Sequence, residues 1–150
     1  QFLQPNSRFD ISETEQELRG GIDMLHAETG NPVGVTGFCM GGALALFAAC
    51  QNSNKVGACV DFYGIHPNVE YDWDSLTAPV LGLWAEHDDM VNPQLTGFAE
   101  ALASRQHNFH FKTYPGTAHA FFNDTNTEGH DVEASADAWE LTLEWFARYL

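Results

Sequence analysis

Residues that together can perform nucleophilic catalysis occur in three separate parts of the chain. Residues 37–42 read Gly-Phe-Cys-Met-Gly-Gly, so Cys39 lies in a G-x-C-x-G-G motif, the nucleophile-elbow pattern with cysteine in place of serine. Carboxylates follow at Asp88 and Asp89, and His119 comes later among apolar neighbours. A thiol, an imidazole that takes its proton and a carboxylate that orients the imidazole are the groups that acyl transfer requires.

The geometry of the elbow explains which residue types its motif contains. The nucleophile is held in a strained backbone conformation, and glycine at positions 37 and 41 lets a strand and a helix approach each other closely. The turn directs the backbone N–H of Met40 and the positive end of the helix toward the thiol, where both favour a thiolate and an anionic tetrahedral adduct. A core cysteine flanked by glycines has a similar motif, so its partners decide the interpretation.

The order of the three groups along the chain separates the possible folds. Nucleophile, then acid, then histidine is the order of an α/β-hydrolase, and other hydrolytic triads use other orders. A class I glutaminase also has a G-x-C-x-G elbow, but it needs an acid two residues after the histidine, and Phe121 stands there. From position alone, either Asp88 or Asp89 can orient His119, because both follow an apolar strand.

The elements that must position these residues are read from apolar periodicity and from breaker residues. Strands and helices alternate, which predicts one α/β domain over residues 1–150 with a parallel sheet and right-handed crossovers. In the final helix we expect Trp139, Leu143 and Phe146 on one face. The expected helices are Ser12–Glu28, the run after Gly42, Pro93–Arg105 and Val132–Tyr149, and the expected strands are Val33–Phe38, Val56–Tyr63, Pro79–Glu86 and Phe109–Tyr114.

Composition excludes several classes of function. A net charge of -15 disfavours binding to nucleic acid, and no apolar run is long enough to cross a bilayer, so we expect a soluble, cytoplasmic protein without a membrane partner. Cys50 and Cys59 lie in apolar runs and are expected to be packed, reduced thiols. No histidine has metal-ligand spacing, so neither a metal nor a cofactor is expected. The sequence does not indicate the oligomeric state.

Four segments together resemble the dienelactone hydrolase family. They are GFCMGG at 37–42, FYG at 62–64, EHDDMV at 86–91 and PGTAHAFFND at 115–124, in the order of that family. The resemblance implies an α/β-hydrolase-type three-layer sandwich, with Cys39 as nucleophile, His119 as base and Asp88 as acid, since the family has Asp-x-x-Val there. It also implies that Tyr63 lines the pocket. Further substrate contacts are predicted at Phe38, Met90 and Phe121.

The resemblance implies hydrolysis of a small-molecule carboxylic ester or lactone through a thioester, without a cofactor. A general esterase or thioesterase of broader range is the alternative, and a catalytically impaired interaction module is a second. Two departures bear on this. The family's carboxylate-binding arginine falls near Asn123, and the family's first strands, which supply a second oxyanion donor, lie upstream of residue 1. We therefore expect residues 1–150 alone to be poorly active.

Overall fold

Strands and helices alternate along residues 11–150, the part of the chain that the computed structural model describes, except that two successive strands within residues 56–87 have no helix between them. The predicted domain of residues 1–150 begins ten residues earlier, and those ten lie outside the described residues. The elements are α1 (Ile11–Thr29), β1 (Val33–Phe38), α2 (Met40–Gln51), β2 (Val56–Phe62), β3 (Val80–His87), α3 (Asn92–Ser104), β4 (Phe109–Ala118) and α4 (Val132–Tyr149).

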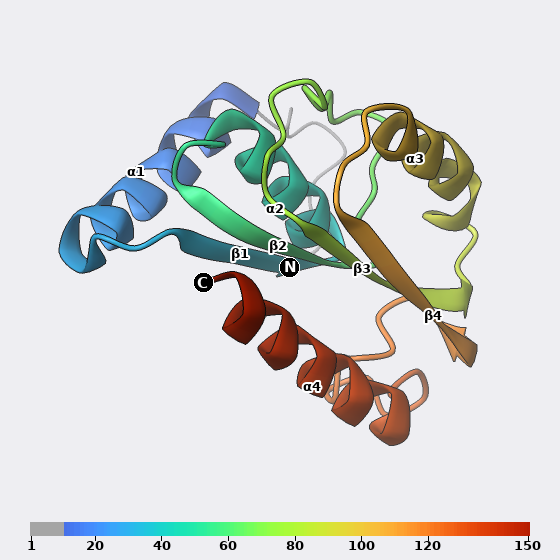
Figure 1. The fold of residues 1–150 in the computed structure, drawn as a ribbon. Coiled ribbons are helices and arrows are strands. Elements are labelled where there is room, and N and C mark those ends of the chain that lie inside the picture. Colours follow the sequence, from blue (N-terminus) through green and yellow to red (C-terminus); the bar gives the residue numbers. More distant parts are fainter. Residues whose placement is uncertain (1–10) are drawn as a thin grey trace.

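The four strands form one parallel sheet in the order β1-β2-β3-β4. Figure 1 shows α4 on one face of this sheet and α1, α2 and α3 on the other, which makes three layers. Helices on both faces explain why β2 and β3 are nearly continuous apolar runs, since a strand covered on both sides has no solvent face. The predicted parallel α/β architecture is confirmed.

Helix α2 is the most deeply buried of the helices. Eight of its twelve residues are buried, and its apolar character extends all round, as expected of a helix packed into the core. It follows β1 directly through Cys39 and lies against β1 and β2. This strand, turn and buried helix hold the elbow at a fixed place at the carboxyl edge of the sheet.

Strand β4 is longer than predicted. Pro115 and Gly116 were expected to end it, but pairing resumes with His87 opposite Ala118 after an irregularity in β3. A proline is tolerated because β4 lies at an edge of the described sheet. On its outer side no described strand pairs with it, so a missing N–H there costs no hydrogen bond between strands. Gly116 takes a φ of 73°, and its N–H donates to Oε2 of Glu86 at 2.7 Å. The extension carries the chain directly to His119.

The three residues of helix α4 that were expected on one face differ in burial. Trp139 and Leu143 are 47% and 52% exposed, whereas Phe146 is partly buried against the core. The buried residues of the helix are mostly small: Ala134, Ala138 and Thr142, with Trp145. Small side chains let the helix axis approach the sheet closely, which outweighs the larger apolar area of Trp139 and Leu143.

No helix among residues 11–150 combines the length and the apolar character that crossing a bilayer would require.

Candidate active site

Cys39 occupies a strained turn between β1 and α2. Its backbone dihedrals are φ 55° and ψ -125°, a left-handed conformation that is rare outside glycine. Its N–H donates to the carbonyl of Phe62 at 3.0 Å, and its own carbonyl accepts from Gly42 N–H at 2.9 Å. A Cβ on residue 37 would collide with the Gly41 carbonyl, whereas one on Gly41 would meet open space. Glycine is thus sterically required at position 37, as predicted. At position 41 the prediction is wrong, because a Cβ there would meet no atom within 4 Å.

His119 lies within hydrogen-bond distance of both expected partners. Its Nε2 is 3.1 Å from Sγ of Cys39, and its Nδ1 is 2.6 Å from Oδ2 of Asp88. The three residues follow β1, β3 and β4, whose carboxyl ends share one edge because the strands are parallel. Residues that are 31 and 80 positions apart in the chain are therefore brought into one line.

Asp88 is distinguished from its neighbour by burial and by its hydrogen bonds. Its side chain is almost fully buried, while Asp89 is exposed. Oδ1 of Asp88 accepts from the backbone N–H groups of Met90 and Val91, both at 3.1 Å, so Oδ2 is left to face His119. These bonds fix the carboxylate in one orientation, with Oδ2 toward His119.

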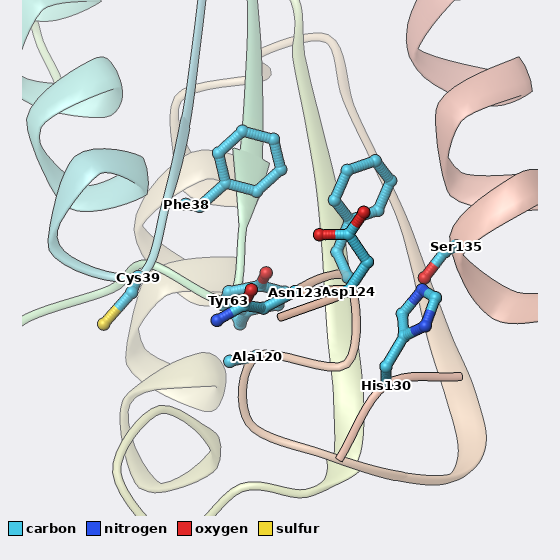
Figure 2. A pocket seen from close by; sticks show the side chains of 9 residues that line it. Phe38, Cys39, Tyr63, Ala120, Asn123, Asp124, His130 and Ser135 are labelled. Atoms are coloured by element: carbon cyan, nitrogen blue, oxygen red, sulfur yellow. The ribbon is translucent and has the colours of Figure 1, made fainter. Parts of the chain in front are cut away.

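A cavity of about 540 Å³ is lined in part by Cys39, which stands at one end of the group of lining side chains in Figure 2. Its volume is in the range of small-ligand pockets. Of the predicted substrate contacts, Phe38 and Tyr63 line it. In Figure 2, Asp124, His130 and Ser135 lie on the side of the view opposite Cys39. The lining residues are Phe38, Cys39, Tyr63, Ala120, Phe122, Asn123, Asp124, His130 and Ser135.

The other two predicted contacts, Phe121 and Met90, do not line the cavity, which corrects the prediction. Phe121 is fully buried, and its ring lies 5.4 Å from that of Tyr63 and 4.9 Å from that of Tyr114. Phe122 faces the cavity instead, because the chain turns at Ala120, where φ is 64°. Met90 is 61% exposed and takes part only through its backbone, which donates to Asp88.

Backbone strain is concentrated at this cavity. Four described residues other than glycine have positive φ, and three of them, Cys39, Tyr63 and Ala120, line the cavity. Such conformations persist only where the surrounding structure enforces them, and they cluster at functional sites. The fourth, Gln106, follows the last turn of α3. The distribution of strain is a second indication, independent of the motif, that this cavity is the site.

Burial keeps the phenol of Tyr63 and the thiols of Cys50 and Cys59 uncharged. Burial raises the pKa of Tyr63 to about 12, so its phenol stays neutral. Burial likewise raises the pKa of Cys50 to about 12 and that of Cys59 well above its ordinary value. Cys39, in contrast, is exposed. It is therefore the one cysteine of the chain that is open to reagents in solution.

Asp61 is an unusual buried acid directly below the elbow. It is fully buried in β2, and burial raises its pKa to about 7. One carboxyl oxygen accepts from Nε1 of Trp84 at 3.2 Å, while the other faces Gly42 and Gly64. A side chain on either glycine would collide with that oxygen, so the acid and the two glycines fit one another.

No group of three or more histidine, cysteine, aspartate or glutamate side chains within residues 11–150 is arranged to hold a metal ion. Asn123, the position where the resemblance places an arginine, lines the cavity with an uncharged amide.

Comparisons with known proteins identify the family and the fold. The model of the dienelactone hydrolase family matches residues 10–150. A carboxymethylenebutenolidase of Rhodococcus opacus is 30% identical over 157 aligned positions, covering 98% of this chain and 60% of that protein. The structure of a dienelactone hydrolase from Anabaena variabilis superposes with a TM-score of 0.71 at 26% identity, covering 97% of this chain and 63% of the other.

The fold is shared more widely than the sequence. An α/β-hydrolase from a deep-sea metagenome is only 19% identical yet has a TM-score of 0.72, covering 97% of this chain and 67% of the other, which confirms the fold class. This chain spans about half the length of the curated relatives that it matches, for example 52% of each of the two from the genus Aquifex. The chain belongs to the dienelactone hydrolase family.

Proposed function

We propose that this site hydrolyses a carboxylic ester or lactone through a thioester on Cys39. The observation that carries the proposal is the line of hydrogen bonds from Sγ of Cys39 through His119 to Asp88, at 3.1 Å and 2.6 Å. A nucleophile in contact with a base that a third group orients is the arrangement of covalent hydrolysis.

In the first half of the reaction, the thiol proton of Cys39 passes to Nε2 of His119 and the thiolate attacks the acyl carbon. The carbonyl π pair moves to oxygen and gives a tetrahedral oxyanion. When the oxyanion collapses, the bond to the alkoxy oxygen breaks and His119 returns the proton to that oxygen. A lactone opens at this step and keeps its alcohol on the same molecule.

In the second half, His119 takes a proton from water and the resulting hydroxide attacks the thioester. Collapse of this second adduct releases the carboxylic acid and restores the thiol. Asp88 does not exchange a proton: it holds the imidazole with Nε2 toward the sulfur and stabilises the imidazolium that forms twice in each cycle. Both steps need only this chain and water.

Met40 supplies one donor for the oxyanion. It is the first residue of α2, and the N–H groups of a first helical turn have no partner within the helix. Such a donor stabilises negative charge that exists only in the transition state and the adduct, and removal of one donor reduces turnover by about 10²- to 10³-fold. Both half-reactions pass through an oxyanion, so this donor serves acylation and deacylation alike.

Single-turnover acylation tests the proposal. After mixing with p-nitrophenyl acetate, we expect release of p-nitrophenol equivalent to the enzyme and a peptide that contains Cys39 with the mass of one added acetyl group. Cys39→Ala is expected to abolish both signals, while Cys59→Ala, which removes a buried thiol, leaves them. Acetylation that persists in Cys39→Ala, or that never reaches Cys39, would rule out the proposed nucleophile and favour the interaction module.

A general esterase or thioesterase is the second candidate, and one observation favours it over strict lactone opening. The cavity opens to solvent at the exposed residues Asn123 and Asp124, so an acyl or alcohol group of variable size can extend outward. A comparison of kcat/KM for a five-membered enol lactone and for an open-chain ester of the same acid separates the two candidates.

A further inference from the structure

The cavity beside Cys39 has an unusual combination of walls. Phe38, Tyr63 and Phe122 supply aromatic rings, and Asp124 supplies a carboxylate. The rings of Phe38 and Phe122 stack with centroids 5.2 Å apart, and Phe38 remains 40% exposed, so part of its surface is open to a ligand. Aromatic faces carry negative electrostatic potential, and a carboxylate beside them adds to it.

Within residues 11–150, no lysine or arginine side chain lines the cavity to offset this potential. Four of the five lysine and arginine residues in that range form ion pairs with acids elsewhere, and the fifth lies over a tyrosine ring. These contacts are Arg19 with Glu15, Lys55 with Asp23, Arg105 with Asp74, Lys112 with Asp137, and Arg148 over Tyr149.

Three further titratable groups stand at or near the cavity: the pair of His119 with Asp88, Tyr63 and His130. His119 is paired with Asp88, so a positive charge on its imidazole would be balanced by that carboxylate. Tyr63 is a neutral phenol, and His130 lies among the lining residues across from Cys39 in the view of Figure 2. Over the whole chain the net charge of -15 also attracts cations and repels anions.

We propose that this cavity selects substrates by charge, taking esters that carry a positively charged ammonium group and disfavouring esters that carry a carboxylate. The inference rests on the proposed function, since it names the substrate class of the same site. An ammonium group can lie against the aromatic rings while Asp124 balances its charge, a pairing that aromatic pockets use for quaternary ammonium ligands. A carboxylate in the same place would meet no lysine or arginine among the residues that the structure describes.

The selection can be measured without catalytic turnover, because Cys39 itself reports the local potential. Methanethiosulfonates react by attack of the thiolate on sulfenyl sulfur, which forms a disulfide and releases methanesulfinate. Three such reagents suit the test: trimethylammonioethyl (cationic), methyl (neutral) and sulfonatoethyl (anionic). Each rate is divided by the rate of that reagent with free 2-mercaptoethanol, which removes the intrinsic differences. Cys50 and Cys59 are buried and do not compete.

We expect normalised rates in the order cationic, neutral, anionic, with the cationic reagent about tenfold faster than the anionic one at low salt. Asp124→Asn is expected to reduce this ratio by about threefold, and Phe122→Leu is expected to reduce it as well. Glu128→Gln is the matched control: Glu128 is an exposed acid in the same loop that does not line the cavity, so the ratio should stay unchanged.

A ratio at or below one, a neutral reagent that reacts fastest, or a ratio that Asp124→Asn leaves unchanged would each overturn the proposal. Failure of all three reagents to label Cys39 would overturn it too, since a cavity closed to them admits no ester.

Hydrolysis is measured in parallel with acetylthiocholine and with S-(2-carboxyethyl) thioacetate. If the labelling order holds and neither compound is hydrolysed, the proposed function fails and the charge selection stands. If the anionic compound is hydrolysed faster, the charge selection fails and the proposed function stands.

Discussion

At the scale of single residues, the candidate site depends on the tautomer of one histidine. Asp88 is fixed by two backbone N–H groups and presents Oδ2 to Nδ1 of His119, so Nδ1 carries the hydrogen and Nε2 is free to accept the thiol proton. In Asp88→Asn the amide oxygen can keep the two backbone bonds, which turns the NH2 group toward Nδ1. The hydrogen then moves to Nε2, where it blocks proton transfer from Cys39.

We therefore expect Asp88→Asn to slow acetylation of Cys39 by roughly 10³- to 10⁴-fold, as the loss of the orienting acid does in serine triads. The rate is followed by release of p-nitrophenol in a stopped-flow experiment. Asp89→Asn removes a neighbouring exposed charge that makes no contact with His119, and it should leave the rate within about twofold. Equal slowing in both variants would mean that general negative charge, rather than orientation of His119, matters.

Asp61 leads to a prediction about stability and pH. Its pKa rises from 3.8 in the unfolded chain to about 7 in the folded protein, because burial disfavours the carboxylate. Between these two values the unfolded chain releases a proton that the folded protein keeps, so stability falls as pH rises toward about 7 and is then constant. The full effect of this one group is roughly 4 kcal/mol.

Urea unfolding at about pH 5 and about pH 8 measures this effect. The free energy of unfolding of the unmodified chain should decrease between the two conditions, and Asp61→Asn should remove most of the decrease. Asp74→Asn is the control, because Asp74 is exposed and Arg105 lowers its pKa, so it titrates below this window. An unchanged slope in Asp61→Asn would show that Asp61 stays ionised in the folded protein.

At the scale of elements, the close approach of β1 and α2 is the feature on which the elbow depends. A Cβ at Gly37 would collide with the backbone of Gly41, and backbone atoms of a buried turn cannot move aside as a flexible side chain can. Gly41 is the matched position, since a Cβ there meets no atom within 4 Å and the residue lies in a helix.

We expect Gly37→Ala to destabilise the chain by roughly 2–4 kcal/mol, in the range of overpacking and backbone strain. Gly41→Ala is expected to be neutral or to stabilise by up to about 1 kcal/mol, because alanine is the better helix former. Urea midpoints of both variants at one pH provide the comparison. Equal stabilities would mean that the turn can relax around an added methyl group.

Elements also mark the limit of what sequence patterns determine. The motif at Cys39 and the order of the strands led to the expectation that Cys39, Asp88 and His119 lie close together, and they do so because parallel strands deliver their carboxyl ends to one edge. The cavity wall was harder to predict, since the choice between Phe121 and Phe122 depends on the left-handed turn at Ala120, which alanine rarely signals. The exposure of Trp139 and Leu143 on α4 could not be predicted from periodicity, which ranks residues by apolar area, whereas close packing favoured Ala138 and Thr142.

At the scale of the whole molecule, two sources of negative potential act on the cavity, and they differ in range. The net charge of -15 is spread over the surface, so mobile ions screen it within about 8 Å at physiological ionic strength. Asp124 and the aromatic rings lie in contact with any bound group, where little solvent intervenes and salt has less effect.

Salt therefore separates the two sources. When ionic strength rises from about 0.01 M to about 1 M, we expect the ratio of cationic to anionic labelling of Cys39 to fall by several-fold and then level off above one. The part that survives high salt should be the part that Asp124→Asn removes, whereas Glu128→Gln should keep it. A ratio that falls to one at high salt in the unmodified chain would assign the selection to overall charge, and the cavity walls would then have no part in it.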